Sequence, residues 1–129
     1  MPKHAYTFTK KYRNLTQILT DHDLASLGDA YINFVYSLAL SNRRKKPSGA
    51  KVKGSMLAEA VRKAGLRGYL PARMTRHMLA DAAEALTVYA WLHGDITLEE
   101  CVALLEKDGD IVNGLSQMLV MIKERTKFS

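Results

Sequence analysis

The apolar stretch LASLGDAYINFVYSLAL, at positions 24–40, restricts the possible folds of this chain more than any other feature. Its apolar residues run almost without interruption at helical spacing, which predicts a long helix from Asp21 or Asp23 to Ser41, buried at the centre of the fold. One carboxylate, Asp29, follows Gly28 inside this stretch. Burial of an unpaired carboxylate is costly. Asp29 therefore caps a helix that starts beside Gly28, pairs with a cation, or holds a metal ion.

The remaining sequence is also helical in pattern, and no stretch has the convincing alternation of a strand. Pro71 suits the first position of a helix that stops at Gly94. Thr97 and Glu100 have the spacing of a capping box, and Asp110 is a suitable cap for the last helix. We expect an all-α fold, a single helical bundle domain over residues 1–129, with further helices at 9–19, 54–65, 71–93, 97–107 and 111–127.

The cysteine content and the N-terminus indicate the compartment. Cys101 is the single cysteine, so it forms no internal disulfide, and we expect it to pack in the core. The N-terminal residues lack the order of a signal peptide. Asp29 interrupts the longest apolar run, which leaves it too short to cross a membrane. These features predict a soluble, cytoplasmic protein.

The charge of the chain favours a polyanionic partner. The formal net charge is +6, and basic residues gather at 42–54 and 62–77, whereas acids gather at 95–110. Cations clustered in this way are typical of RNA-binding surfaces, although the same loop at 42–53 could simply be solvated. Because A-form duplexes hide their major groove, we expect contacts mainly to phosphates and 2′-hydroxyls. The candidate RNA-binding residues are Arg43, Arg44, Lys45, Lys46, Lys51, Lys53, Arg73 and Arg76.

A second apolar stretch, LADAAEALTVYAWL at 79–92, contains two carboxylates, Asp81 and Glu84. Residues three apart on a helix share a face, with Cβ atoms about 5–6 Å apart. If the two apolar helices pack together, Asp29 completes a cluster of three oxygen ligands that suits Mg²⁺. Alternatively, the two acids form a polar stripe that pairs with cations earlier on the same helix, namely Arg73, Arg76 or His77.

Other side chains have simpler interpretations. His77 lies one turn before Asp81, where it could assist proton transfer, but a helical histidine is more often a surface residue. The remaining histidines do not have the spacing of metal ligands: His4, His22 and His93. The aromatic residues of the central helix are expected in the core rather than as stacking platforms for bases: Tyr31, Phe34 and Tyr36.

Two motifs together resemble the ribonuclease III family. SLGDAYINFVYSLAL, at 26–40, is similar to the family's Leu-Gly-Asp signature helix, and LADAAEALTVYAWLHGD, at 79–95, is similar to its Asp-x-x-Glu-Ala-Leu helix. The resemblance covers roughly residues 15–105. It implies an all-helical homodimer, formed through the signature helix, that cleaves double-stranded RNA with Mg²⁺, or with Mn²⁺ in its place. Asp29, Asp81 and Glu84 then correspond to the catalytic, metal-binding carboxylates.

The sequence also departs from that family. The larger bacterial enzymes have glutamates one and two turns before the signature aspartate, where this chain has Ala25 and His22. The compact mini-ribonuclease III branch is nearer in form, because it also lacks a separate RNA-binding domain and has a small apolar residue in place of the first glutamate. This chain, however, keeps Asp81, which that branch usually lacks.

Two functions follow from the resemblance and the charge. The first is a metal-dependent endoribonuclease acting on double-stranded or structured RNA, for example in ribosomal RNA processing. The second is a non-catalytic RNA-binding protein on the same fold, such as a ribosome-associated or ribosomal protein. The missing carboxylate at Ala25 favours the second, and the three retained carboxylates favour the first.

Overall fold

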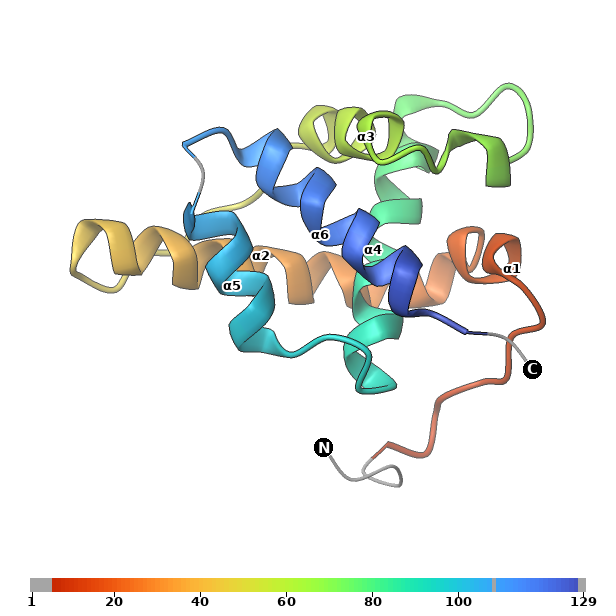
Figure 1. Ribbon diagram of the computed structural model, residues 1–129, viewed down its shortest axis with the longest axis horizontal. Helices are drawn as coiled ribbons and strands as arrows, with labels where there is room; N and C mark the ends of the chain where they lie inside the picture. Colours follow the sequence, from red (N-terminus) through yellow and green to blue (C-terminus); the bar gives the residue numbers. More distant parts are fainter. Residues whose placement is uncertain (1–5, 108, 128–129) are drawn as a thin grey trace.

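The computed structural model describes residues 6–107 and 109–127, and in these ranges the regular structure is entirely helical (Figure 1). The predicted all-α class is therefore confirmed. No helix in the described ranges is long and apolar enough to span a membrane. In chain order the elements are α1 (Leu15–Leu19), α2 (His22–Arg44), α3 (Gly54–Lys63), the 3₁₀ helix η1 (Arg67–Tyr69), α4 (Arg76–Leu92), α5 (Leu98–Lys107) and α6 (Ile111–Arg125).

Helices α2 and α4 cross at the centre of the fold and pack against each other more extensively than any other pair (Figure 1). The most buried helix is α4, in which 11 of 17 residues are buried, compared with 6 of 23 in α2. Helix α2 is therefore central, as predicted, but the prediction that it is buried is wrong for most of its residues. Phe34, expected in the core, is 54% exposed, whereas Tyr31 is buried and Tyr36 is half-buried.

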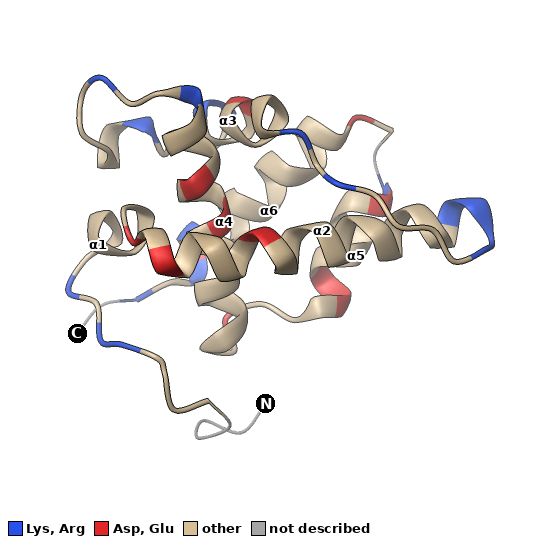
Figure 2. Cartoon of the chain, turned by 180° about the vertical axis from the view of Figure 1, so that it is seen from behind, with Lys and Arg blue, Asp and Glu red and all other residues tan. Residues whose placement is uncertain are grey.

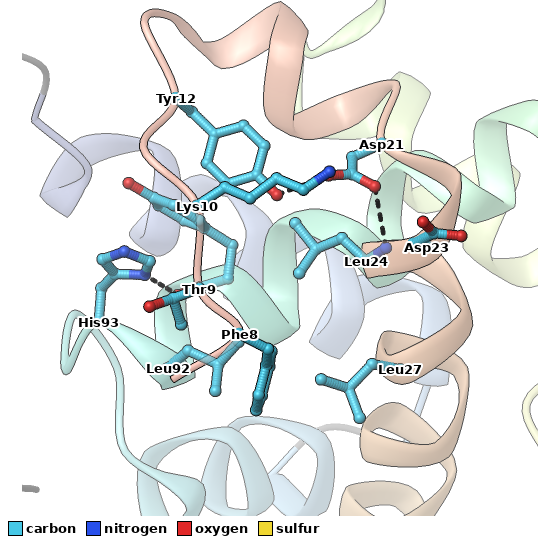
Figure 3. A pocket seen from close by; sticks show the side chains of 11 residues that line it. Phe8, Thr9, Lys10, Tyr12, Asp21, Asp23, Leu24, Leu27, Leu92 and His93 are labelled. Atoms are coloured by element: carbon cyan, nitrogen blue, oxygen red, sulfur yellow. Dashed lines mark hydrogen bonds and ion pairs between the residues drawn. The ribbon is translucent and has the colours of Figure 1, made fainter. Parts of the chain in front are cut away.

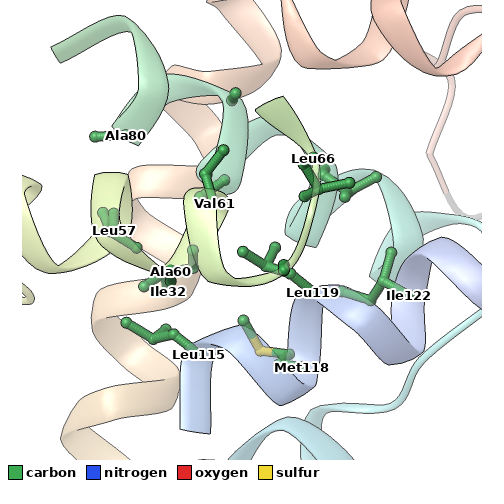
Figure 4. Packing of buried hydrophobic residues seen from close by; sticks show 14 of the residues in the cluster. Ile32, Leu57, Ala60, Val61, Leu66, Ala80, Leu115, Met118, Leu119 and Ile122 are labelled. Atoms are coloured by element: carbon green, nitrogen blue, oxygen red, sulfur yellow. The ribbon is translucent and has the colours of Figure 1, made fainter. Parts of the chain in front are cut away.

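The core lies between α2, α3, α4 and α6. Ile32 of α2, Val61 of α3 and Leu119 of α6 are all fully or almost fully buried and belong to one apolar cluster (Figure 4). Cys101 of α5 is buried in the same cluster, as predicted. This packing of α3 and α6 holds α4 in place, so the position of α4 against α2 is set by the core rather than by a loop.

The predicted first helix over 9–19 is mostly wrong, because only Leu15–Leu19 is helical. Asn14 caps α1 by accepting a hydrogen bond from the Gln17 amide at 2.9 Å, which places the helix start later than expected. The preceding segment lies along the fold instead. Tyr12 packs edge-on against Tyr89, and its hydroxyl donates to Asp21 at 2.6 Å (Figure 3).

The start of α4 also differs from the prediction. The helix begins at Arg76 rather than at Pro71, because Thr75 caps it by accepting from the Met78 amide at 3.1 Å. The Pro71 carbonyl accepts from Arg67 and lies in a loop that also contains Arg73. The fourth helix is thus shorter at its start than the sequence suggested.

The remaining helix ends agree better with the sequence. Helix α2 continues past Ser41 to Arg44, so the first three residues of the predicted basic loop are helical, and Lys45 ends the helix in the left-handed conformation. Helix α3 is followed closely by Gly65, which has a φ of +75°. The predicted caps of the last two helices are confirmed by hydrogen bonds between Thr97 and Glu100 and from the Val112 amide to Asp110.

Candidate active site

Gly28 allows the close approach of α2 and α4 that creates the candidate site. It is buried, and a Cβ at this position would overlap the backbone carbonyl of Glu84. The glycine therefore lets the two backbones touch, which brings the next residue, Asp29, beside Glu84. Because α2 runs without a break through both residues, the alternative that Asp29 caps a separate helix is wrong.

The three predicted carboxylates, Asp29, Asp81 and Glu84, line one cavity of about 310 Å³. Figure 2 shows acidic positions where α2 and α4 meet, and basic positions along the segment that joins α2 to α3. The cavity is bounded by α2, by the start of α3 and by α4. Its other lining residues are His22, Ala25, Ser26, Lys51, Val52, Gly54, Leu57, His77 and Ala80.

Glu84 is the most perturbed acid of this cavity. It is only 8% exposed. Burial raises its pKa to about 8, and a hydrogen bond to Asp29 and the negative charges of Asp29 and Asp81 act in the same direction. The positive charge of Lys51 partly opposes this shift. In the protein without a bound cation, Glu84 therefore holds a proton near neutral pH and donates it to Asp29 in a hydrogen bond.

Asp29 has a further partner that sequence reasoning missed. Asn33, one turn later on α2, donates from Nδ2 to Asp29 Oδ1 at 3.1 Å. The Asn33 Oδ1 accepts from the Val52 amide at 2.9 Å. Asn33 thus fixes both the carboxylate and the chain next to Lys51. The spacing of four residues from Asp29 was the available signal, but the contact with Val52 could not be inferred from it.

Asp81 faces two histidines. Its Oδ2 lies 3.3 Å from Nδ1 of His22, at the start of α2, and 3.8 Å from Nε2 of His77 on its own helix. Of the predicted same-helix partners, His77 is thus the one that approaches Asp81. The contact between His22 and Asp81 joins two helices, so residue spacing along the chain gave no sign of it.

The donor types in the cavity fit a hard divalent cation. As the side chains stand, no three His, Cys, Asp or Glu residues in the described ranges are grouped closely enough to hold a metal. Asp29 and Glu84 instead bond to each other, and Asp81 turns toward the histidines. Mg²⁺ keeps several waters and needs few direct protein ligands, and three carboxylates crowded around one cavity are the oxygen donors that it prefers. Burial and the neighbouring carboxylates Asp29 and Asp81 raise the pKa of Glu84, and such a cation would offset the effect of the carboxylates.

The predicted RNA-binding residues fall into different groups. Arg43 has a structural role, because its Nη2 donates to the carbonyls of Leu105 at 3.2 Å and Glu106 at 2.7 Å, at the end of α5. Lys51 lines the carboxylate cavity itself, whereas the other six predicted cations lie outside its lining. These six cations are exposed and lie at the end of α2 and around the starts of α3 and α4: Arg44, Lys45, Lys46, Lys53, Arg73 and Arg76.

A second cavity, of about 350 Å³, adjoins the first and shares Gly54 and His77 with it. Ser55 and Arg76 complete its lining. No side chain caps the start of α3 here, because Lys53 at the capping position makes no such hydrogen bond. An uncapped helix start beside Arg76 offers positive potential next to the carboxylate cavity.

Comparison with known protein families shows to which family the chain belongs. The family model described as ribonuclease III matches residues 22–125. The chain belongs to the ribonuclease III family. The match includes every residue that lines the carboxylate cavity, and the membership supports a ribonuclease-type function on RNA. A comparison with curated proteins gives no match.

A third cavity, of about 280 Å³, is separate from the carboxylate cavity. It lies under the segment before α1, against α2 and the end of α4 (Figure 3). Phe8, Leu24 and Leu27 give it an apolar side, and none of the three site carboxylates lines it. We therefore assign no chemistry to this cavity.

Proposed function

We propose that the protein is a Mg²⁺-dependent endoribonuclease of the cytoplasm that cleaves double-stranded or structured RNA. One observation carries the proposal. Asp29 from α2 and Asp81 and Glu84 from α4 line a single cavity, and this cavity lies within the part of the chain that matches the ribonuclease III family.

The residues around the cavity have distinct proposed roles. Asp29, Asp81 and Glu84 would hold the divalent ion, with Asn33 keeping Asp29 in position. A bound Mg²⁺ would activate a water molecule and stabilise the charge that develops on the phosphate. Lys51 would contact the phosphate at the cavity, and no protein nucleophile is required.

The exposed basic residues support an RNA substrate that is recognised by the shape of its duplex rather than by its sequence. Exposed cations lie next to the starts of α3 and α4, beside the carboxylate cavity, and others lie farther from it, at the end of α2. Such residues contact phosphates and 2′-hydroxyls of an A-form duplex with little sequence preference. Ribosomal RNA precursors are one substrate of this structured kind.

We further propose a homodimer formed through α2. Leu27 is 40% exposed and Phe34 is 54% exposed, and residues seven apart lie on the same face of a helix. A two-fold interface there would place two carboxylate cavities along one RNA duplex, one for each strand. Light scattering at micromolar concentration should give the mass of a dimer. Phe34→Glu should give a monomer, whereas Met78→Glu, at another exposed apolar residue, should not. A wild-type monomer would contradict the homodimer.

The alternative function is a non-catalytic RNA-binding protein, for example one associated with the ribosome. Ala25 favours it, because this buried residue gives the cavity wall a methyl group where the larger bacterial enzymes that the chain resembles have a carboxylate. A site with one ligand fewer could bind RNA without cutting it.

Incubation with a generic RNA duplex distinguishes the two functions. The enzyme should cut the duplex internally with Mg²⁺ or Mn²⁺ and lose activity when EDTA is added. Tight binding of the duplex without cleavage in either metal would overturn the nuclease and leave the RNA-binding protein.

A further inference from the structure

His22 lies at a fixed point of the fold opposite α4. It is the first residue of α2, whose start is capped by Asp21 through a hydrogen bond from the Leu24 amide at 3.1 Å. Asp21 is itself held by the Tyr12 hydroxyl at 2.6 Å. The backbone of His22 is therefore anchored, while its imidazole is 80% exposed and lines the carboxylate cavity.

The imidazole of His22 meets Asp81 from the other helix. The His22 Nδ1 lies 3.3 Å from Asp81 Oδ2, and His77 approaches the same oxygen at 3.8 Å. The cavity thus contains a nitrogen donor directly beside a carboxylate, with Glu84, a nine-tenths buried acid, on the same wall. This mixture of donors differs from an all-oxygen site.

Mixed nitrogen and oxygen donors change which metal a site prefers. Carboxylates and water suit Mg²⁺, whereas imidazole suits transition metals, whose affinity for such sites rises from Mn²⁺ to Co²⁺. We propose that His22 is a nitrogen ligand for the divalent ion held by Asp81, so that this site binds transition metal ions more tightly than Mg²⁺, the ion of the proposed cleavage reaction. The inference rests on the proposed function, because it concerns the same metal site.

His77 has a different role in this proposal. Its longer distance to Asp81, and its place on the same helix, suit a residue that orients the carboxylate rather than one that binds the ion. Residues that orient metal ligands in this way are common around metal sites. The two histidines can therefore be separated by experiment.

The test is titration of the purified full chain with Co²⁺ alone and with Mg²⁺ alone by calorimetry, together with the ¹⁵N spectra of the histidine side chains. The wild type should bind Co²⁺ at least about tenfold more tightly than Mg²⁺, and the imidazole signals of His22 should move or broaden first. His22→Ala should lower the Co²⁺ affinity by at least the ~10–100-fold that removal of a residue orienting a metal ligand costs, and change the Mg²⁺ affinity by less than about threefold.

Three controls make this test specific. His93→Ala removes an exposed histidine from another part of the fold, where Nδ1 lies 2.9 Å from the Tyr89 carbonyl, and it should leave Co²⁺ binding unchanged. His77→Ala should weaken Co²⁺ binding less than His22→Ala does. His22→Asn, which also removes the imidazole, should lower the Co²⁺ affinity as His22→Ala does. It is the variant to use if His22→Ala does not fold.

Two results would overturn the inference. If His22→Ala binds Co²⁺ as the wild type does, and the His22 signals do not respond, the site is an all-oxygen site while the proposed nuclease stands. If the wild type binds neither metal and cuts no RNA, the nuclease proposal fails as well.

Discussion

The carboxylate cavity and the basic end of α2 are both charged, but the fold holds their charges differently. Glu84 is buried, bonds to Asp29 and has a pKa raised to about 8, so its surroundings disfavour the charged form of the side chain. Arg44, Lys45 and Lys46 are exposed, which leaves their charges in solvent. Changes in the cavity should therefore alter stability, pH dependence and catalysis together, whereas changes at the end of α2 should alter RNA affinity alone.

The largest effect is expected from Gly28→Ala. The new methyl group would overlap the Glu84 carbonyl, so α2 and α4 must separate, at a cost of about 3 kcal/mol or more. Thermal or urea unfolding measures this destabilisation. Gly54→Ala is the matched control, because its Cβ would meet only the Ala80 methyl at 3.9 Å. Equal stability of the two variants would show that the helices do not touch at Gly28.

Glu84→Gln tests the buried acid through pH. A raised pKa means that the folded state prefers the protonated form, so its stabilising effect is full below pH 4.5 and is lost as pH rises through about 8. In EDTA, Glu84→Gln should therefore be more stable than the wild type by about 1–3 kcal/mol at pH 9, since each pKa unit corresponds to about 1.4 kcal/mol and solvent reduces the full value. Parallel stability curves of the two proteins from pH 6 to pH 9 would contradict the raised pKa.

Lys51 connects the two regions, because it is a cation that lines the cavity. Lys51→Gln should lower kcat by about tenfold, equivalent to about 1.4 kcal/mol, with little change in KM, if its ammonium acts on the phosphate during cleavage. Lys53→Gln, two residues away and outside the cavity lining, should leave kcat within about twofold. Equal decreases of kcat in both variants would contradict a special role of Lys51 in cleavage and leave it as one of the residues that bind the RNA backbone.

The smallest effect is expected from replacing Arg44, Lys45 and Lys46 by alanine. RNA binding should weaken and its salt dependence should flatten, by a slope of about 0.9 for each phosphate that the variant no longer neutralises, by analogy with DNA. Cleavage at saturating RNA should not change. Arg43 is excluded from the set because it holds the end of α5. A lower kcat with an unchanged salt slope would place these residues in the cleavage step instead.

The sequence predicted helix ends correctly where one local signal determined them. It predicted them wrongly where two local signals competed. Thr97, Glu100 and Asp110 are caps whose hydrogen bonds need only neighbouring residues, and these predictions are confirmed. Pro71 is also a suitable helix start, but Thr75 is the cap that the fold uses. Phe34 was misplaced because helical spacing does not tell which apolar face of a helix lacks a neighbour.

The same limit explains what was missed in the site. Asp81 and Glu84 share a helix, so their proximity follows from spacing. Asp29 was added by supposing that the two apolar helices pack together, and the resemblance to a family supported this addition. The contact between His22 and Asp81 joins two helices, and the bond from Val52 to Asn33 joins a helix to a loop. Such contacts depend on how α2 crosses α4, which the sequence pattern alone does not specify.

Asp29→Asn tests the central claim, that the three carboxylates form one catalytic metal site, most directly. The change keeps the size of the side chain and removes its charge. With cleavage and binding of one RNA duplex measured in the same Mg²⁺ buffer, cleavage should fall by at least about a hundredfold, because a metal contributes several kcal/mol to such a reaction. RNA affinity should stay the same or rise, since a negative charge that faces phosphate is gone. Cleavage equal to that of the wild type would contradict a catalytic metal site at Asp29.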